Sequence, residues 1–237
     1  MIKIKLAGLR IQIENRFSAV ERLCREYMSD FDGCPDISVK ITDEEIAQNR
    51  TVFSREFDDG YLESVCIYRA ICKKLPLFDR LMLHSSIVKS GNKAIAFCGK
   101  SGVGKTTHTK LLLKNYPELK VINGDKPILH IKDNEILALP SPWAGDDGLK
   151  SLEQAPLDTL CFLEQAKENR LVTLEKNEAL SLLLGQFIVP TEPLVAAKHL
   201  ELVDRLLDSC KLYKLYCTED DSAAMLSYKK LIKGETL

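Results

Sequence analysis

Residues 99–107, GKSGVGKTT, constrain this chain more than any other part of its sequence. They match the pattern Gly-x4-Gly-Lys-Ser/Thr of a Walker A phosphate-binding loop. Before the loop, residues 93–98 form a short apolar run between Gly91 and Gly99, which indicates a buried strand. After it, residues 106–114 are compatible with a helix, so the flanks are those that the motif requires. A glycine turn without a ligand is the alternative.

Phosphate binding explains the residue types in this loop. Glycines can adopt positive φ and bring successive N–H groups against phosphate oxygens, and a helix N-terminus favours negative charge. In this interpretation an exposed Lys105 reaches the β and γ phosphates of a nucleotide, and the Thr106 hydroxyl binds Mg²⁺. The predicted nucleotide-binding residues are Gly99, Ser101, Gly102, Val103, Gly104, Lys105, Thr106 and Thr107.

Composition narrows the class of protein. The chain has 237 residues, with 33 Lys and Arg against 34 Asp and Glu, and no long basic run, so we expect no nucleic-acid or membrane-surface partner. The first six residues alternate apolar and charged, as in a strand rather than a signal peptide. The 8 cysteines form no Cys-x-x-Cys pair and several lie in apolar runs, which predicts reduced thiols, no zinc site and a cytoplasmic protein.

Hydrophobic periodicity predicts alternating strands and helices. We expect an N-terminal strand-rich region at residues 1–60, packed on a nucleotide-binding core at 61–237. The expected strands are 1–14, 37–41, 51–57, 82–88, 93–98, 119–122, 157–163, 170–174 and 212–217, with a hairpin of 128–132 and 135–139; the expected helices are 18–28, 60–75, 106–114, 177–187, 194–209 and one from 222.

Two polar residues near the loop are candidates for chemistry. Asp125 follows the strand at 119–122, and an acid there binds Mg²⁺ or takes a proton from the nucleophile in phosphoryl-transfer proteins. Alternatively, Asp125 opens a turn before Pro127. His84 stands at the start of the strands leading to the loop, where it could donate or relay a proton. A hydrogen-bonded histidine at a strand end is its alternative.

Residues 139–148, LPSPWAGDDG, contain the only tryptophan of the chain. Prolines restrict the backbone at the start of this segment and glycines leave it freer at the end, so we expect a loop of defined shape. It is predicted to form a substrate wall or lid through Trp143 and Gly145. A surface turn with Trp143 packed for its area is the alternative.

Together, residues 83–86 (LHSS), the glycine loop, residues 123–125 (NGD) and residues 142–145 (PWAG) resemble the HPr kinase and phosphoenolpyruvate carboxykinase-like P-loop superfamily, and within it the small HPr-kinase-related proteins. The resemblance extends over residues 60–190. It implies an α/β fold in which a mixed, largely antiparallel twisted sheet and flanking helices surround a P-loop. The hairpin expected at 128–139 agrees with such a sheet.

The resemblance also implies roles for individual residues. Lys105 becomes the phosphate clamp, Thr106 and Asp125 the Mg²⁺ ligands, and Asp125 the candidate base, with His84 beside the phosphates. The chain departs from the family pattern where Gly124 and Asp125 replace an Asp-Asp pair. It also lacks the Leu-Glu-x-Arg-Gly signature of bifunctional HPr enzymes and the basic set of a carboxykinase.

These observations predict a kinase that uses ATP and Mg²⁺ to phosphorylate a hydroxyl, serine-like, in a peptide, a protein or a small molecule. The alternative is a nucleotide-dependent switch or binding protein with slow hydrolysis. None of the motifs encodes the acceptor, the choice of ATP or GTP, or the oligomeric state.

Overall fold

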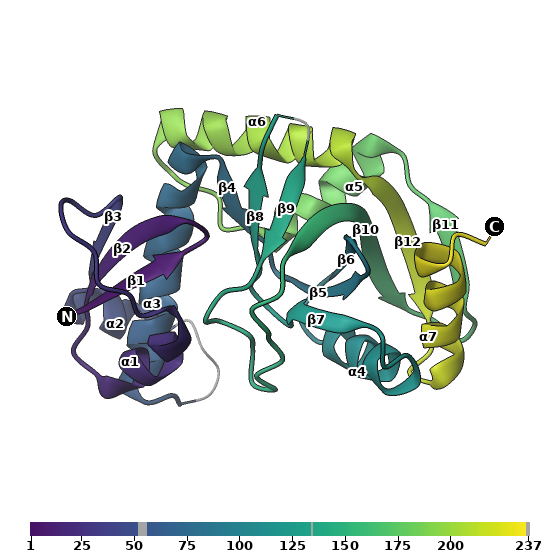
Figure 1. The fold of residues 1–237 in the computed structure, drawn as a ribbon, viewed down its shortest axis with the longest axis horizontal. Coiled ribbons are helices and arrows are strands. Elements are labelled where there is room, and N and C mark those ends of the chain that lie inside the picture. The colour runs from purple at the N-terminus through teal and green to yellow at the C-terminus, as the bar shows by residue number, and fades with distance from the viewer. Residues whose placement is uncertain (52–55, 134, 236–237) are drawn as a thin grey trace.

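The computed structural model describes residues 1–51, 56–133 and 135–235. A small sheet with three helices lies at one end of the molecule, and a large sheet with the remaining helices forms the rest (Figure 1). We call the elements from β1 to α3 the N-terminal lobe. The fold is mixed α/β, with a mixed, largely antiparallel sheet and flanking helices, as expected from the sequence.

The N-terminal lobe is built on alternating strands whose apolar residues face one side. β1 and β2 form an antiparallel hairpin, and β3 pairs parallel to β2 after the crossover through α1. The turn of the hairpin uses Ala7 and Gly8, both at positive φ. The elements are β1 (Ile2–Leu6), β2 (Leu9–Glu14), α1 (Ser18–Cys24), the 3-10 turn η1 (Arg25–Tyr27), β3 (Ile37–Lys40), α2 (Asp43–Arg50) and α3 (Asp59–Lys74).

The large sheet has the strand order β4-β8-β9-β10-β6-β5-β7, with β12 on β10 and β11 on β12. In this sheet β10 pairs parallel with β6 and with β12, and the other pairings are antiparallel. The strands are β4 (Arg80–Met82), β5 (Ser85–Ser90), β6 (Lys93–Cys98), β7 (Lys120–Asn123), β8 (Ile128–Ile131), β9 (Ile136–Leu139), β10 (Ala155–Gln165), β11 (Arg170–Thr173) and β12 (Lys211–Cys217).

Helices cover both faces of the large sheet. Successive residues of β6 belong to different hydrophobic clusters: Ala96 packs with α5 and α6, and Phe97 with α4 and α7. Burial on both faces explains why β6 is continuously apolar from Ala94 to Cys98 rather than alternating. The helices are η2 (Leu75–Phe78), α4 (Lys105–Asn115), α5 (Lys176–Leu183), η3 (Leu184–Gln186), α6 (Pro193–Ser209), α7 (Asp221–Ser227) and the π-helical η4 (Tyr228–Ile232).

The strand predicted at 82–88 is wrong as one element, because the chain is interrupted between β4 and β5. At the break, the Leu83 N–H donates to the Pro127 carbonyl (3.0 Å) and the His84 N–H to the Gln186 carbonyl (2.9 Å). These long-range bonds turn His84 out of the ladder. The strand predicted at 51–57 falls mainly on residues 52–55, outside the described residues.

A third cluster of buried apolar residues joins the N-terminal lobe to the rest of the chain. It contains the inward side chains of β1, β2, β3 and α3, and Met82, Ile128 and Trp143 from beyond the lobe. The last three residues lie at or near the segments that carry His84, Asp125 and the loop before β10. The lobe therefore packs directly behind the candidate site.

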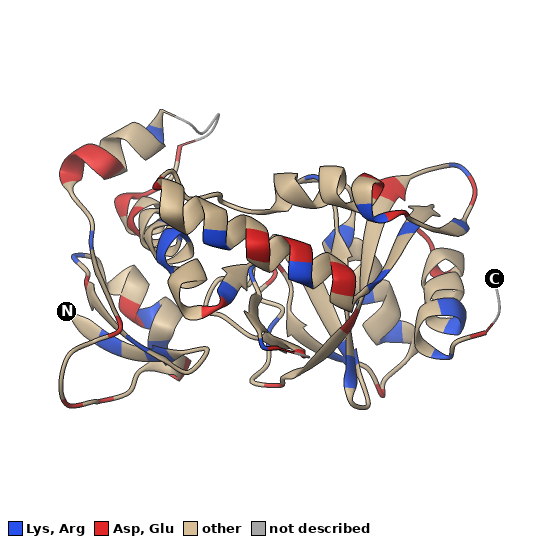
Figure 2. Cartoon of the chain, turned by 90° about the horizontal axis from the view of Figure 1, so that it is seen from above, with Lys and Arg blue, Asp and Glu red and all other residues tan. Residues whose placement is uncertain are grey.

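Charges of both signs are distributed over the surface. Figure 2 shows acidic and basic bands alternating along α6, where Lys198 pairs with Asp79 (3.1 Å) and Glu201 (3.0 Å). Among residues 1–51, 56–133 and 135–235, no helix combines the length and apolar character needed to cross a bilayer.

Glu63 of α3 is a buried carboxylate with a structural task. Its side chain is fully buried and accepts hydrogen bonds from the backbone N–H groups of Arg16 (2.8 Å) and Phe17 (3.1 Å) at the start of α1. Replacing Glu63 with Ala leaves both N–H groups without this acceptor and should lower the unfolding free energy by about 2–4 kcal/mol in urea titrations. Glu63→Gln, which keeps one acceptor oxygen, should lose less.

The matched control is Glu168→Ala, at an exposed position, which should change the unfolding free energy by less than about 0.5 kcal/mol. Equal losses in Glu63→Ala and Glu168→Ala would contradict the role assigned to the Glu63 carboxylate.

Candidate functional site

The glycine-rich loop at residues 99–107 connects β6 to α4 and leaves the start of α4 open. Gly104 is the N-cap residue at φ 102°, and no side chain caps the helix. Gly102 is also at positive φ, and nothing lies within 4 Å of a Cβ built on Gly102 or Gly104. The first N–H groups of a helix have no partner inside it and attract negative charge. This loop therefore presents uncapped donors at an open surface.

Lys105, the first residue of α4, is buried rather than exposed as the sequence predicted, with 7% of its surface accessible. Its Nζ donates to the carbonyl oxygens of Gly99 (2.9 Å) and Lys100 (3.2 Å) of the same loop. Burial lowers the pKa of Lys105 from its usual value. The ammonium group is thus held within the loop by neutral acceptors, which an anionic ligand can replace.

Asn123, at the end of β7, determines where Asp125 lies. Its fully buried amide accepts hydrogen bonds from the N–H groups of Asp125 (2.9 Å) and Lys126 (2.8 Å) and donates to the Ser141 carbonyl (3.0 Å). This is an Asx turn, which holds a short bend at the strand end. Gly145 approaches from the facing loop, and a Cβ there would lie 3.2 Å from the Asp125 Cβ.

The Asp125 carboxylate forms a pair with His84 and a pair with Lys126. Its Oδ1 is 3.3 Å from the His84 Nε2 and 2.8 Å from the Lys126 Nζ. Burial acts to raise the pKa of Asp125, but the hydrogen bond from His84 and the charge of Lys126 outweigh it and lower the pKa to about 2. Asp125 is therefore ionised at neutral pH.

The environment of His84 favours its neutral form at neutral pH. Its hydrogen bond with Asp125 acts to raise its pKa, but burial and the nearby charges of Lys126 and Lys105 together lower the pKa below its usual value. The neutral ring can then donate from Nε2 to the carboxylate, which assigns the tautomer. The resulting pair joins a proton donor to an acceptor in one half-buried unit.

One cavity of about 550 Å³ brings most of the predicted residues together. Gly99 and Val103 do not line it: a Cβ on Gly99 would contact Val103, and Val103 faces the other side of the loop. Trp143 is buried outside it, with its Nε1 donating to the Ser64 carbonyl of α3 (3.2 Å). The lining residues are Tyr61, His84, Ser101, Gly102, Gly104, Lys105, Thr106, Thr107, Gly124, Asp125, Lys126, Ala144, Gly145, Asp146, Asp147 and Leu149.

Four polar residues of this cavity were not among the predicted site residues. Asp146 and Asp147 are the acidic pair of the loop at 139–148, so the sequence carried a visible signal for them. Lys126 follows Asp125 directly, but its contact with that carboxylate depends on the Asx turn. Tyr61 comes from the N-terminal lobe, and no motif surrounds it.

The oxygen donors of the cavity fit Mg²⁺ bound together with a nucleotide. Mg²⁺ in nucleotide sites takes one or two carboxylates or hydroxyls and otherwise phosphates and water. Thr106 and Asp125 supply a hydroxyl and a carboxylate on the same cavity. Within the described residues there is no group of three or more His, Cys, Asp or Glu that could hold a metal ion by themselves. The donor set thus suits a metal that needs phosphate ligands.

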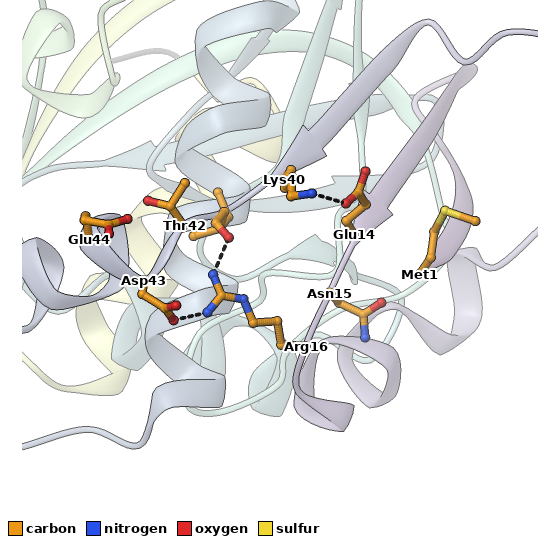
Figure 3. A pocket seen from close by; sticks show the side chains of 9 residues that line it. Met1, Glu14, Asn15, Arg16, Lys40, Thr42, Asp43 and Glu44 are labelled. Atoms are coloured by element: carbon orange, nitrogen blue, oxygen red, sulfur yellow. Dashed lines mark hydrogen bonds and ion pairs between the residues drawn. The ribbon is translucent and has the colours of Figure 1, made fainter.

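A second cavity of about 550 Å³ in the N-terminal lobe has a different character. Figure 3 shows two ion pairs among its side chains, Arg16 with Asp43 and Lys40 with Glu14 at 2.9 Å, while Glu44 lies apart from them. It contains no glycine-rich loop, and the start of α2 that lines it is capped by the side chains of Thr42 and Glu45. These ion pairs partner both of its basic side chains, whereas Lys105 in the first cavity is held by neutral carbonyls.

Solved structures include a distant match to this chain. No family model and no curated protein matches the sequence. Among solved structures, the chain is similar to the HPr(Ser) kinase/phosphatase from Coxiella burnetii, with a TM-score of 0.38, 9% identity, and coverage of 65% of this chain and 99% of that one. This is a distant similarity in fold only.

The lowered pKa of Asp125 predicts how the stability of the protein changes with pH. Because its pKa falls from 3.8 to about 2 on folding, the unfolded chain binds more protons between these values, and stability falls as the pH falls. Between about pH 5 and pH 2, wild type should lose about 2 kcal/mol more unfolding free energy than Asp125→Asn, measured by urea titration at each pH.

The control is Asp32→Asn, which removes an exposed carboxyl of the N-terminal lobe. It should keep the steep acid dependence of wild type. Parallel pH curves for wild type and Asp125→Asn would show that the contacts with His84 and Lys126 do not stabilise the ionised carboxylate.

Proposed function

We propose that this protein is a Mg²⁺- and ATP-dependent kinase that transfers the γ-phosphoryl group to a hydroxyl. The observation that carries the proposal is a shared cavity: the uncapped start of α4, Lys105 and the Asp125–His84 pair all line it. Phosphoryl transfer needs this combination of donors for the phosphates and a carboxylate for the nucleophile.

In the proposed complex, the N–H groups of the glycine-rich loop and the first turn of α4 bind the phosphate oxygens. Lys105 exchanges its two loop carbonyls for phosphate oxygens, which are stronger acceptors. Thr106 and Asp125 would hold Mg²⁺, which when bound would supply positive charge that offsets the negative charge of the phosphates. Most of the rate enhancement then comes from positioning and charge neutralisation.

Asp125 orients the acceptor hydroxyl and receives its proton. As the bond between the acceptor oxygen and the γ phosphorus forms, the bond from that phosphorus to the β–γ bridging oxygen breaks, and ADP leaves. The transition state of such transfers is loose, so the carboxylate can act chiefly by orienting the hydroxyl despite its low pKa. His84 contacts Oδ1 of Asp125 and thereby fixes the orientation of the carboxylate.

The motif resemblance supports a place for this chain among HPr-kinase-related proteins. The loop at 139–148 would then serve as the substrate wall, through Gly145 beside Asp125 and Trp143 behind it. All 8 cysteines, which lie within the described residues, are free. Free thiols support a cytoplasmic location, where ATP is available.

A nucleotide-dependent switch is the second candidate, and the low pKa of Asp125 favours it. A carboxylate with a pKa of about 2 is a weak proton acceptor, and efficient general bases have pKa values nearer the working pH. A switch would bind and slowly hydrolyse the nucleotide without an acceptor. The two candidates differ in where the phosphate goes.

Lys105→Ala should abolish productive nucleotide binding while leaving the fold intact. The substitution removes the ammonium group that the loop holds for the phosphates, and its partners are loop carbonyls rather than core residues. Calorimetric titration with Mg-ATP should show at least a ten-fold loss of affinity, about 1.4 kcal/mol. Lys114→Ala, on the same helix but paired with Asp221, is the control and should bind as wild type.

Asp125→Asn should keep ATP binding and lose phosphoryl transfer by about 10²- to 10⁴-fold. Asparagine keeps the shape but cannot take a proton and is a poorer metal ligand. The measurement is mass spectrometry of acceptor panels with Mg-ATP, together with release of inorganic phosphate. A wild-type protein that releases only inorganic phosphate would be a switch, and transfer by Asp125→Asn within a few-fold of wild type would place the base elsewhere.

A further inference from the structure

The cavity that Lys105 lines is called the phosphate cavity below, and another cavity of about 530 Å³ adjoins it at Asp125. It lies between α1 and α3 of the N-terminal lobe and the loop before β10, which descends between the two parts of the molecule in Figure 1. The Asp125 carboxylate is thus accessible from both cavities. The residues that line both cavities are Tyr61, Asp125, Lys126, Ala144, Gly145 and Asp146.

Rigid aromatic and apolar side chains form part of its wall. Trp143 is held by its bond to the Ser64 carbonyl, and its ring centroid lies 6.0 Å from that of Tyr68. Leu23 and Val65 add apolar surface from α1 and α3. The volume lies within the range of about 300–1,000 Å³ that small-molecule sites occupy. The wall therefore suits the body of a small organic compound.

Positive charge exceeds negative charge around this cavity. Arg22, Arg69, Lys126 and Lys150 line it, against Asp125 and Asp146. Lys126 pairs with Asp125 (2.8 Å) and Lys150 with Glu26 (2.5 Å), so these two cations have acidic partners.

The two arginines differ from the lysines in their partners. Arg22 donates to the Ser18 hydroxyl (2.8 Å), and Arg69 donates to the side-chain carbonyl of Asn49. Neither takes part in an ion pair between described residues. Guanidinium groups bind carboxylates and phosphates through two parallel hydrogen bonds, more strongly than they bind neutral acceptors. Arg22 and Arg69 are thus suited to an anion that enters the cavity.

We propose that this cavity binds the phosphoryl acceptor, and that the acceptor is a small hydroxyl compound with an anionic group, a carboxylate or a phosphate. Arg22 and Arg69 bind the anionic group, and the apolar body lies against Trp143 and Tyr68. The hydroxyl then points to Asp125, where the two cavities meet. This inference rests on the proposed kinase function only for the phosphorylation of the hydroxyl. Binding of the compound does not require that function.

Binding can be measured without turnover, because Trp143 is the only tryptophan of the chain and lines the cavity. Three probes share one skeleton and differ in charge: 3-phenyllactate, 2-hydroxy-3-phenylpropyl phosphate and the neutral 3-phenylpropane-1,2-diol. At least one anionic probe should bind at least about ten-fold more tightly than the diol, as measured by tryptophan fluorescence and calorimetry. The carboxylate and phosphate arms identify which anion is preferred.

The double variant Arg22→Gln/Arg69→Gln should reduce that difference between the anionic probe and the diol to less than about three-fold. Mg-ATP affinity should be unchanged, since neither arginine lines the phosphate cavity. Arg25→Gln, an exposed position of η1 outside both cavities, is the control and should behave as wild type. Arg22→Gln alone, on exposed α1 surface, serves if the double variant does not fold.

Equal affinities of the wild type for all three probes, or an unchanged preference in the folded variants, would overturn the proposed acceptor cavity while leaving the kinase proposal intact. Anion binding that depends on Arg22 and Arg69, in a protein that transfers no phosphate, would instead support the anion site and refute the kinase. The two proposals therefore fail in different ways.

Discussion

The candidate site depends on the hydrogen bonds of the buried Asn123 side-chain amide. One side chain joins the end of β7, the bend at Asp125 and Lys126, and the segment at Ser141. Because each of its groups is buried and hydrogen-bonded, no alternative bend is available without leaving a polar atom unpaired. The position of Asp125 relative to α4 is thus determined by a residue that touches neither cavity.

Local patterns predicted the centre of the fold well. The apolar run at 93–98, the glycine-rich loop and the helix after it correspond to β6 and α4, and the hairpin at 128–139 corresponds to β8 and β9. These elements follow from residues close in sequence. The long strand expected at 82–88 was wrong because the backbone of Leu83 and His84 bonds to Pro127 and to the turn after α5, which no local pattern encodes.

The candidate site was predictable in its residue types and not in its contacts. His84, Lys105 and Asp125 do line one cavity, but the burial of Lys105 depends on loop carbonyls that only the folded backbone brings around it. The contact of Tyr61 with the site requires α3 to pack behind the loop before β10. Such long-range packing depends on side-chain shape over the whole lobe, and motifs carry no information about it.

The strand order has a consequence for the protein as it is synthesised. The N-terminal lobe comes from one continuous stretch, β1 to α3, and can gain most of its core as it leaves the ribosome. β6, which leads into the glycine-rich loop, pairs on one side with β10, and β10 in turn needs β12 near the end of the chain. During translation the N-terminal lobe therefore emerges first, and the strands that support the glycine-rich loop are complete only after β12 has emerged.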